Sequence, residues 1–119
     1  MNSKNKRIQF ESDRLVQQII DGRKTASADN LKDIDKDVDD YNSALVVGQY
    51  YDVYDSRLVN RTTIRITGLE LCRWDSISEK LWRGETNSSA DEFRQDHLEF
   101  FNHPADDFEF AAFYFEKVE

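Results

Sequence analysis

The chain has few of the residues on which disulfide-rich, zinc-binding and membrane-spanning proteins depend. Cys72 is the single cysteine, which excludes an intramolecular disulfide and a cysteine-rich zinc site. No apolar run approaches the roughly 18 residues of a membrane-crossing helix, and the polar residues 1–6 precede no signal-type apolar stretch. We therefore expect a cytoplasmic protein that needs no metal, no cofactor and no membrane.

Basic residues are also in deficit. The chain has 24 acidic and 16 basic residues, which gives a net charge of −8. Proteins that bind nucleic acid strongly gain affinity by neutralising several phosphates with Lys and Arg, so we expect no duplex DNA partner. A small nucleoside or a single-stranded RNA remains compatible with a local cleft, because the acidic residues are unevenly distributed.

The acidic stretch at residues 32–40 resembles the start of a calcium-binding loop. Its aspartates alternate from Asp33 to Asp37, as in an EF-hand. However, Val38 stands where the turn requires glycine, and Ala44 stands where a bidentate glutamate is required. We interpret the stretch as a solvated loop whose like charges repel one another.

What the chain does contain is enough apolar material for one core. Of its 119 residues, 39% are hydrophobic and 13% are aromatic, which argues against disorder. No repeat or linker separates a second unit, so we predict a single domain over residues 1–119.

The residue pattern in the first half of the chain predicts a strand, a helix and a second strand. Ile8 and Phe10 suggest a short strand, and Ser12 suits the N-cap of an amphipathic helix that ends at Gly22. A strand follows at residues 50–54, where aromatic and β-branched side chains gather.

The second half predicts a long strand, two helices and a final strand. The long strand covers residues 61–73, with a bulge or bend at Gly68. Capping boxes that open at Ser76 and Ser89 predict the helices, the second with an apolar stripe, and residues 108–115 predict the last strand. The fold class is therefore α+β, and we expect mostly antiparallel strands that curl into a small barrel with flanking helices.

One short run of residues contains the side chains that are the strongest candidates for catalysis. Residues 22–27 place Lys24 three positions before Ser27, which pairs an amine with an alcohol. Glu85 is the carboxylate that could lie opposite them. The alternative for Lys24 is a surface charge at the end of a helix dipole, and the alternative for Glu85 is an exposed residue before a helix.

These motifs, in order, resemble those of a known family. The run at 22–27, the strand at 48–55 and the segment from Gly84 to Phe101 are similar to the ASCH domain, a PUA-like fold of β-barrel and flanking helices. The resemblance covers residues 10–119. It implies a nucleoside or RNA ligand and, by similarity to small amidohydrolases that deacetylate N4-acetylcytidine, catalytic roles for Lys24, Ser27 and Glu85. Asp29 departs from the basic residue found at that position in those enzymes.

The resemblance also implies a mechanism and its alternatives. An uncharged Lys24, favoured by burial or by the Arg23 charge, would take the proton of Ser27, and Glu85 would assist the leaving nitrogen. Arg23, Thr25 and Tyr54 are the expected substrate-binding residues. The alternative is a non-catalytic module that binds RNA or a modified nucleotide, or a ribonuclease. His97 is expected to be a packed, hydrogen-bonded helix residue, and Tyr50, Tyr54, Trp74 and Trp82 are candidates for base stacking.

Overall fold

The computed structural model describes residues 5–10, 12–31 and 45–118. In chain order the elements are β1 (Lys6–Gln9), α1 (Asp13–Ile20), β2 (Ala26–Asp29), β3 (Tyr50–Tyr54), β4 (Asn60–Arg73), α3 (Glu79–Gly84), α4 (Ala90–His97) and β5 (Glu109–Lys117). The protein is thus mixed α+β, as the sequence predicts. The whole acidic stretch at 32–40 and the nearby Ala44 lie outside the described residues.

The strands form one open sheet. Its order is β1-β3-β4-β5-β2, with β1 parallel to β3 and the other pairs antiparallel. The prediction of mostly antiparallel pairing is confirmed, but the prediction of a closed barrel is wrong. Within the described residues, β1 and β2 are the two edges, and the free edge of β2 bonds to side chains instead of to another strand.

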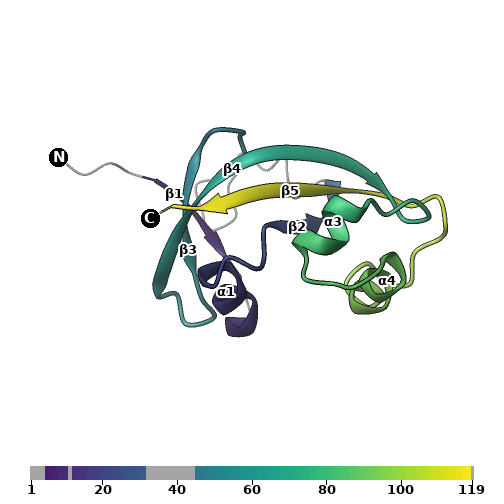
Figure 1. The fold of residues 1–119 in the computed structure, drawn as a ribbon, viewed down its shortest axis with the longest axis horizontal. Helices are drawn as coiled ribbons and strands as arrows, with labels where there is room; N and C mark the ends of the chain where they lie inside the picture. The colour runs from purple at the N-terminus through teal and green to yellow at the C-terminus, as the bar shows by residue number, and fades with distance from the viewer. Residues whose placement is uncertain (1–4, 11, 32–44, 119) are drawn as a thin grey trace.

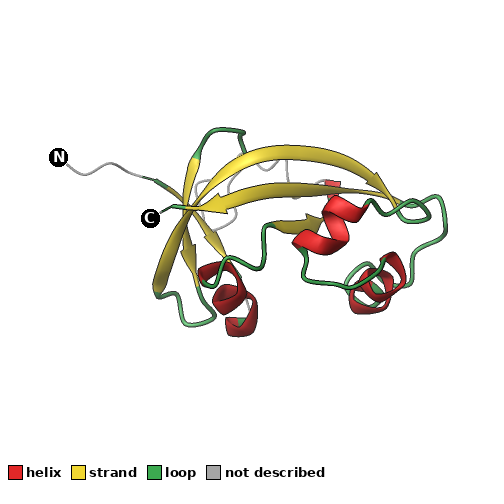
Figure 2. Cartoon of the chain, viewed as in Figure 1, coloured by secondary structure: helices red, strands yellow, loops and turns green. Residues whose placement is uncertain are grey.

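The two longest strands, β4 and β5, pair with each other along most of their length. The pairing runs from Ile64 opposite Lys117 to Arg73 opposite Glu109, and its register shifts between Ile66 and Gly68. This shift confirms the irregularity predicted at the glycine. The pair arches across Figure 1, and Figure 2 shows the helices gathered on one side of it.

A serine residue is the N-cap of each of the helices α1, α3 and α4. Ser12 and Ser89 accept hydrogen bonds from the backbone N–H groups of Leu15 and Glu92, as predicted. For α3 the predicted start at Ser76 is two residues early. Ser78 is the N-cap and accepts from the N–H of Leu81, because the N–H of Ser76 already closes a turn onto Arg73. None of the described helices has the length and apolar character needed to cross a membrane.

Two apolar clusters fill the concave side. One packs α1 against β1, β3 and part of β4 and β5, and Val16 and Ile64 are fully buried in it. The other packs α3 and α4 against β2 and the far parts of β4 and β5, and it contains the buried Phe93 and Phe110. Residues from β1 and α1 and residues from β2, α3 and α4 line a common cleft, so the site lies where these two halves of the molecule meet.

Candidate functional site

Lys24 is buried in the bend between α1 and β2. Gly22 has a φ of +80°, a left-handed conformation that costs a glycine little, and it turns the chain sharply after the helix. The carbonyl of Gln18 accepts hydrogen bonds from the N–H groups of both Arg23 and Lys24, which fixes this bend. Lys24 is only 2% exposed. The alternative of a surface charge at a helix end is therefore excluded.

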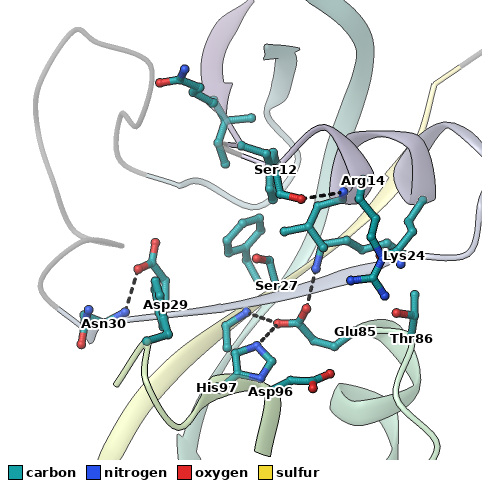
Figure 3. Close-up of a pocket in the computed structure, with 18 residues that line it drawn as sticks. Ser12, Arg14, Lys24, Ser27, Asp29, Asn30, Glu85, Thr86, Asp96 and His97 are labelled. Atoms are coloured by element: carbon teal, nitrogen blue, oxygen red, sulfur yellow. Dashed lines mark hydrogen bonds and ion pairs between the residues drawn. The ribbon is translucent and has the colours of Figure 1, made fainter. Parts of the chain in front are cut away.

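The amine of Lys24 forms a buried ion pair with Glu85. Its Nζ lies 2.5 Å from Oε1 of Glu85 and 2.7 Å from the carbonyl oxygen of Ala26. Glu85 is only 8% exposed and follows α3 directly, so it is not an exposed residue before a helix. The two segments that carry the candidate chemistry do face one another, as Figure 3 shows.

The same two side chains satisfy the outer edge of β2. Glu85 Oε2 accepts the N–H of Ala28 at 2.7 Å, while Lys24 donates to the carbonyl of Ala26. These two backbone groups point away from β5, so without the ion pair they would need a further strand or water. The pair thus covers a sheet edge that would otherwise be open to pairing with another chain.

Close packing of α3 against β2 brings Glu85 into position. The carbonyl of Gly84 accepts the N–H of Thr25 at 2.9 Å. A Cβ atom at position 84 would lie 2.6 Å from the Cβ of Ala26 and 3.2 Å from its backbone nitrogen. Glycine at this position is therefore what lets the end of α3 approach the bend that holds Lys24.

His97 completes the cluster from α4. Its Nε2 lies 3.2 Å from Oε2 of Glu85, and its Nδ1 lies 2.8 Å from the carbonyl oxygen of Phe93. Both neighbours are acceptors when Glu85 is ionised, so only a doubly protonated ring donates to both at once. The ring also stacks on Phe93, with centroids 4.0 Å apart.

Glu85 is held in its ionised form. Burial alone would raise the pKa of this carboxyl, but the charge of Lys24 and the contact with His97 outweigh burial and lower the pKa from 4.5 to about 2. At neutral pH the carboxylate therefore stays charged.

Lys24, Glu85 and His97 line one cleft together with Ser27. The cleft has a volume of about 780 Å³, and apolar side chains from β1, α1 and β5 line it beside the polar cluster. In β2 the half-buried Ser27 and Asp29 alternate with the buried Ala26 and Ala28, and Ser27 and Asp29 both line the cleft. The structure therefore brings Lys24, Ser27 and Glu85 together in one cavity.

The expected substrate-binding residues are placed elsewhere. Arg23 is exposed and pairs with Asp21 at 3.4 Å, so the charge beside Lys24 is Glu85 and not Arg23. Thr25 is exposed in the bend, and Tyr54 is half-buried in β3. None of the three lines this cleft. The stacking candidates Tyr50, Trp74 and Trp82 do not line it either.

Several cleft residues were missed at the level of sequence. His97 is a packed, hydrogen-bonded helix residue, as predicted, but neither it nor Phe100 was predicted to line the cleft. Phe100 lies beyond the end of α4, is 55% exposed and lines the cleft. Arg14 and Gln18 from α1 also line it. The helical spacing of Arg14 and Gln18, which places them on one face, was the available signal.

Charged groups of both signs line the cleft. Arg14, Lys24 and His97 are opposed by Asp29, Glu85 and Asp96. Among residues 5–10, 12–31 and 45–118, no cluster of three His, Cys, Asp or Glu side chains is arranged to hold a metal ion. The cleft therefore has no strong net charge of either sign with which to attract a polyanion.

Comparisons with known proteins agree with this architecture. A family model described as the ASCH domain matches residues 5–116. The structure is similar to an ASCH domain from Lactobacillus crispatus JV V101, with a TM-score of 0.74 and 16% identity over 95% of this chain and 80% of the other. It is also similar to protein EF3133 from Enterococcus faecalis V583, with a TM-score of 0.68 and 22% identity over 99% of this chain and 78% of the other. No curated protein sequence matches the chain. At these identities the two solved structures support a shared PUA-like fold and nothing finer.

Proposed function

Because this chain belongs to the ASCH domain family, which is generally RNA-related, we propose that its cleft binds a nucleoside and hydrolyses an acyl amide on the base, as in N4-acetylcytidine. The observation that carries the proposal is the buried ion pair of Lys24 and Glu85 in the same cleft as the Ser27 hydroxyl. A buried, coupled acid and amine beside an alcohol is the arrangement that activates a nucleophile.

The size and charge of the cleft favour this class of ligand. A volume of about 780 Å³ lies in the range of small-molecule sites. The balance of three basic and three acidic side chains matches an uncharged nucleoside better than a polyphosphate. The apolar side chains of Phe10, Leu15 and Phe100 offer surface to the faces of a base.

In the proposed first step, Ser27 attacks the acyl carbon. Moving one proton along the hydrogen bond from Lys24 Nζ to Glu85 Oε1 converts the ion pair into an amine and a carboxylic acid. The amine then takes the proton of Ser27 Oγ as the bond between Oγ and the acyl carbon forms. This route differs from the one expected from sequence in the group that contacts Lys24, which is Glu85 and not Arg23.

The remaining steps release both products and restore the site. Lys24 gives its proton to the base nitrogen as the carbon–nitrogen bond breaks, which leaves an acyl ester on Ser27 and the free exocyclic amine. Water then attacks the ester, with Lys24 as base and Ser27 as the protonated leaving group, and releases the carboxylic acid. Finally Glu85 returns its proton to the amine, so the sum is amide plus water to amine plus acid.

A second function, ligand binding without hydrolysis, has its own supporting observation. Lys24 and Glu85 both bond to the free edge of β2, so a structural role alone gives a reason for burying them. In that case the cleft binds a modified nucleotide or RNA segment, and Ser27 contributes only a hydrogen bond. The two functions differ in one measurable property, the loss of the acyl group.

The deciding experiment is incubation of the purified protein with a panel of N4-acyl cytidines and N6-acyl adenosines, followed by chromatography of the nucleosides. We expect deacylation by the parent protein and its loss in Ser27→Ala. Thr67→Ala is the matched control, because Thr67 is an exposed hydroxyl of β4 that does not line the cleft. Equal rates in the parent and Ser27→Ala proteins would disprove the serine mechanism. Saturable binding with no deacylation would establish the second function.

A further inference from the structure

One buried polar group in the cleft has no partner. Gln18 is 4% exposed, and its amide oxygen Oε1 is buried without a hydrogen bond within the described part of the chain. The buried residues of α1 are Val16, Gln18 and Ile19, so Gln18 is the one polar member of an otherwise apolar set. Gln18 also lines the cleft.

Nothing in the fold requires an amide at this position. The backbone carbonyl of Gln18 fixes the bend before Lys24, but that contact is available to any residue. The side-chain oxygen Oε1 makes no hydrogen bond to α1, the bend, β2 or any other described part of the chain. An amide oxygen removed from water without a new partner opposes folding, and native proteins rarely keep such groups without a reason.

We propose that Gln18 is a recognition residue whose Oε1 accepts a hydrogen bond from an N–H group of the bound base. This inference rests on the proposed function and names the feature of the substrate that the cleft reads. In an N4-acyl cytosine the donor is the N–H of the acyl amide, which lies next to the ring acceptor N3. An amide side chain presents an acceptor and a donor side by side, so in this complex Gln18 Nε2 would give the second hydrogen bond to N3.

A neutral acceptor suits this task better than the acidic residues of the same cleft. Asp29 and Asp96 also line it, but a carboxylate that enters a closed complex must lose its hydration. The amide oxygen of Gln18 is already desolvated in the free protein. Binding therefore gives this oxygen a partner without burying a charge, and a ligand that lacks the N–H leaves the oxygen unpaired.

The test uses Gln18→Met, which keeps an unbranched side chain of similar size. Affinity for N4-acetylcytidine is measured by calorimetry in the Ser27→Ala background, so that the ligand is not consumed, and thermal midpoints are measured for each protein. We expect a dissociation constant at least tenfold higher in Gln18→Met and a thermal midpoint equal to or above that of the parent. Gln17→Met is the matched control, because Gln17 is the exposed neighbour that bonds to Asp21.

A second ligand keeps the test independent of how the variant folds. N4-acetyl-N4-methylcytidine lacks the N–H and should bind the Gln18 protein at least tenfold more weakly than N4-acetylcytidine. Equal affinity for the two ligands would overturn the inference, and so would an unchanged affinity in Gln18→Met, the result expected if water occupies this position.

The outcomes separate this inference from the proposed hydrolysis. If the parent protein binds N4-acetylcytidine without deacylating it, and Gln18→Met binds weakly, the recognition role stands and the hydrolase proposal falls. If the parent deacylates the ligand and Gln18→Met does so with the same kcat/KM, the hydrolase stands and the recognition role falls. If the parent protein binds neither cytidine derivative, both fall.

Discussion

Lys24 and Glu85 meet across 61 positions of sequence, with Nζ and Oε1 2.5 Å apart in a site that excludes solvent from both. The contact joins the bend after α1 to the end of α3, and it also covers the free edge of β2. One ion pair therefore links two halves of the molecule, the edge of its sheet and its candidate chemistry.

The first prediction concerns the cost of breaking this pair. Lys24→Met leaves a buried carboxylate without its countercharge, and we expect a loss of about 3–5 kcal/mol in the free energy of unfolding. The double variant Lys24→Met with Glu85→Gln removes both charges and should recover part of that loss. Urea unfolding at pH 7 measures each value. A double variant that loses the sum of the two single losses would show that the charges are not coupled.

The second prediction concerns acid. Because the pKa of Glu85 is lowered from 4.5 to about 2 in the folded protein, its contribution to stability is fully present above about pH 4.5 and is lost as pH falls toward 2. The contribution amounts to about 3 kcal/mol. Urea unfolding between pH 6 and pH 2.5 measures it. The Glu85→Gln protein is the control, and its stability should fall less over this interval; parallel curves would contradict the assignment.

The third prediction concerns the approach of α3 to the bend. A Cβ at Gly84 would lie 2.6 Å from that of Ala26, so Gly84→Ala must push the end of α3 away from β2. We expect a loss of about 1–3 kcal/mol in stability together with reduced activity, because Glu85 moves with the helix. Gly68→Ala is the control, since its nearest neighbour would be 3.9 Å away, an ordinary contact. Equal effects of the two substitutions would argue against close packing at Gly84.

The fourth prediction concerns Phe100 as a surface for the base. Phe100 is 55% exposed, lines the cleft and lies edge-on to His97 at 6.5 Å between ring centroids. Stacking on an aromatic ring contributes about 1–3 kcal/mol per base, so Phe100→Ala should weaken cytidine binding by about 5- to 150-fold. Leu71→Ala removes an exposed apolar side chain of β4 outside the cleft and should leave affinity unchanged. Unchanged affinity in Phe100→Ala would remove the residue from the site.

The fifth prediction concerns salt. The cleft carries basic and acidic groups in equal number, so affinity for a nucleoside should change less than twofold between 50 and 500 mM salt. A protein that binds RNA through its phosphates would instead lose affinity steeply over that range. Parallel titrations with cytidine and with a short single-stranded RNA measure the difference. A steep loss for cytidine itself would contradict the charge balance described here.

Local patterns in the sequence predicted most of the elements. The caps at Ser12 and Ser89, the turn at Gly22 and the irregularity at Gly68 are all set by short-range chemistry, and each was predicted correctly. Ser76 and Ser78 both fit a capping pattern, and only the turn that binds the N–H of Ser76 selects the second. The prediction of a closed barrel was wrong because closure is not a local property of the sequence. Whether a sheet closes depends on the meeting of its first and last strands, and periodicity within a strand says nothing about that.

The candidate site was predicted only in part for the same reason. Lys24 and Ser27 lie in one short run, and the spacing of an amine and an alcohol is visible in the sequence. The contact of Glu85 with His97 spans two helices and depends on how α4 packs, so no local pattern marks it. The exposed Arg23 pairs with Asp21, and the order of these residues in the sequence does not show this pairing.

The place of β5 in the sheet has a consequence for how the protein is made. β5 lies between β4 and β2, although β2 precedes it by about 80 residues, so β2 has no neighbour until Glu109–Lys117 has left the ribosome. A nascent chain cut short of this strand would hold the alcohol of Ser27 on a segment that has no described strand to pair with, although the contacts of Lys24 and Glu85 lie outside β5. The cleft, which Phe113 of β5 lines, therefore takes its described form only once this strand has joined the sheet.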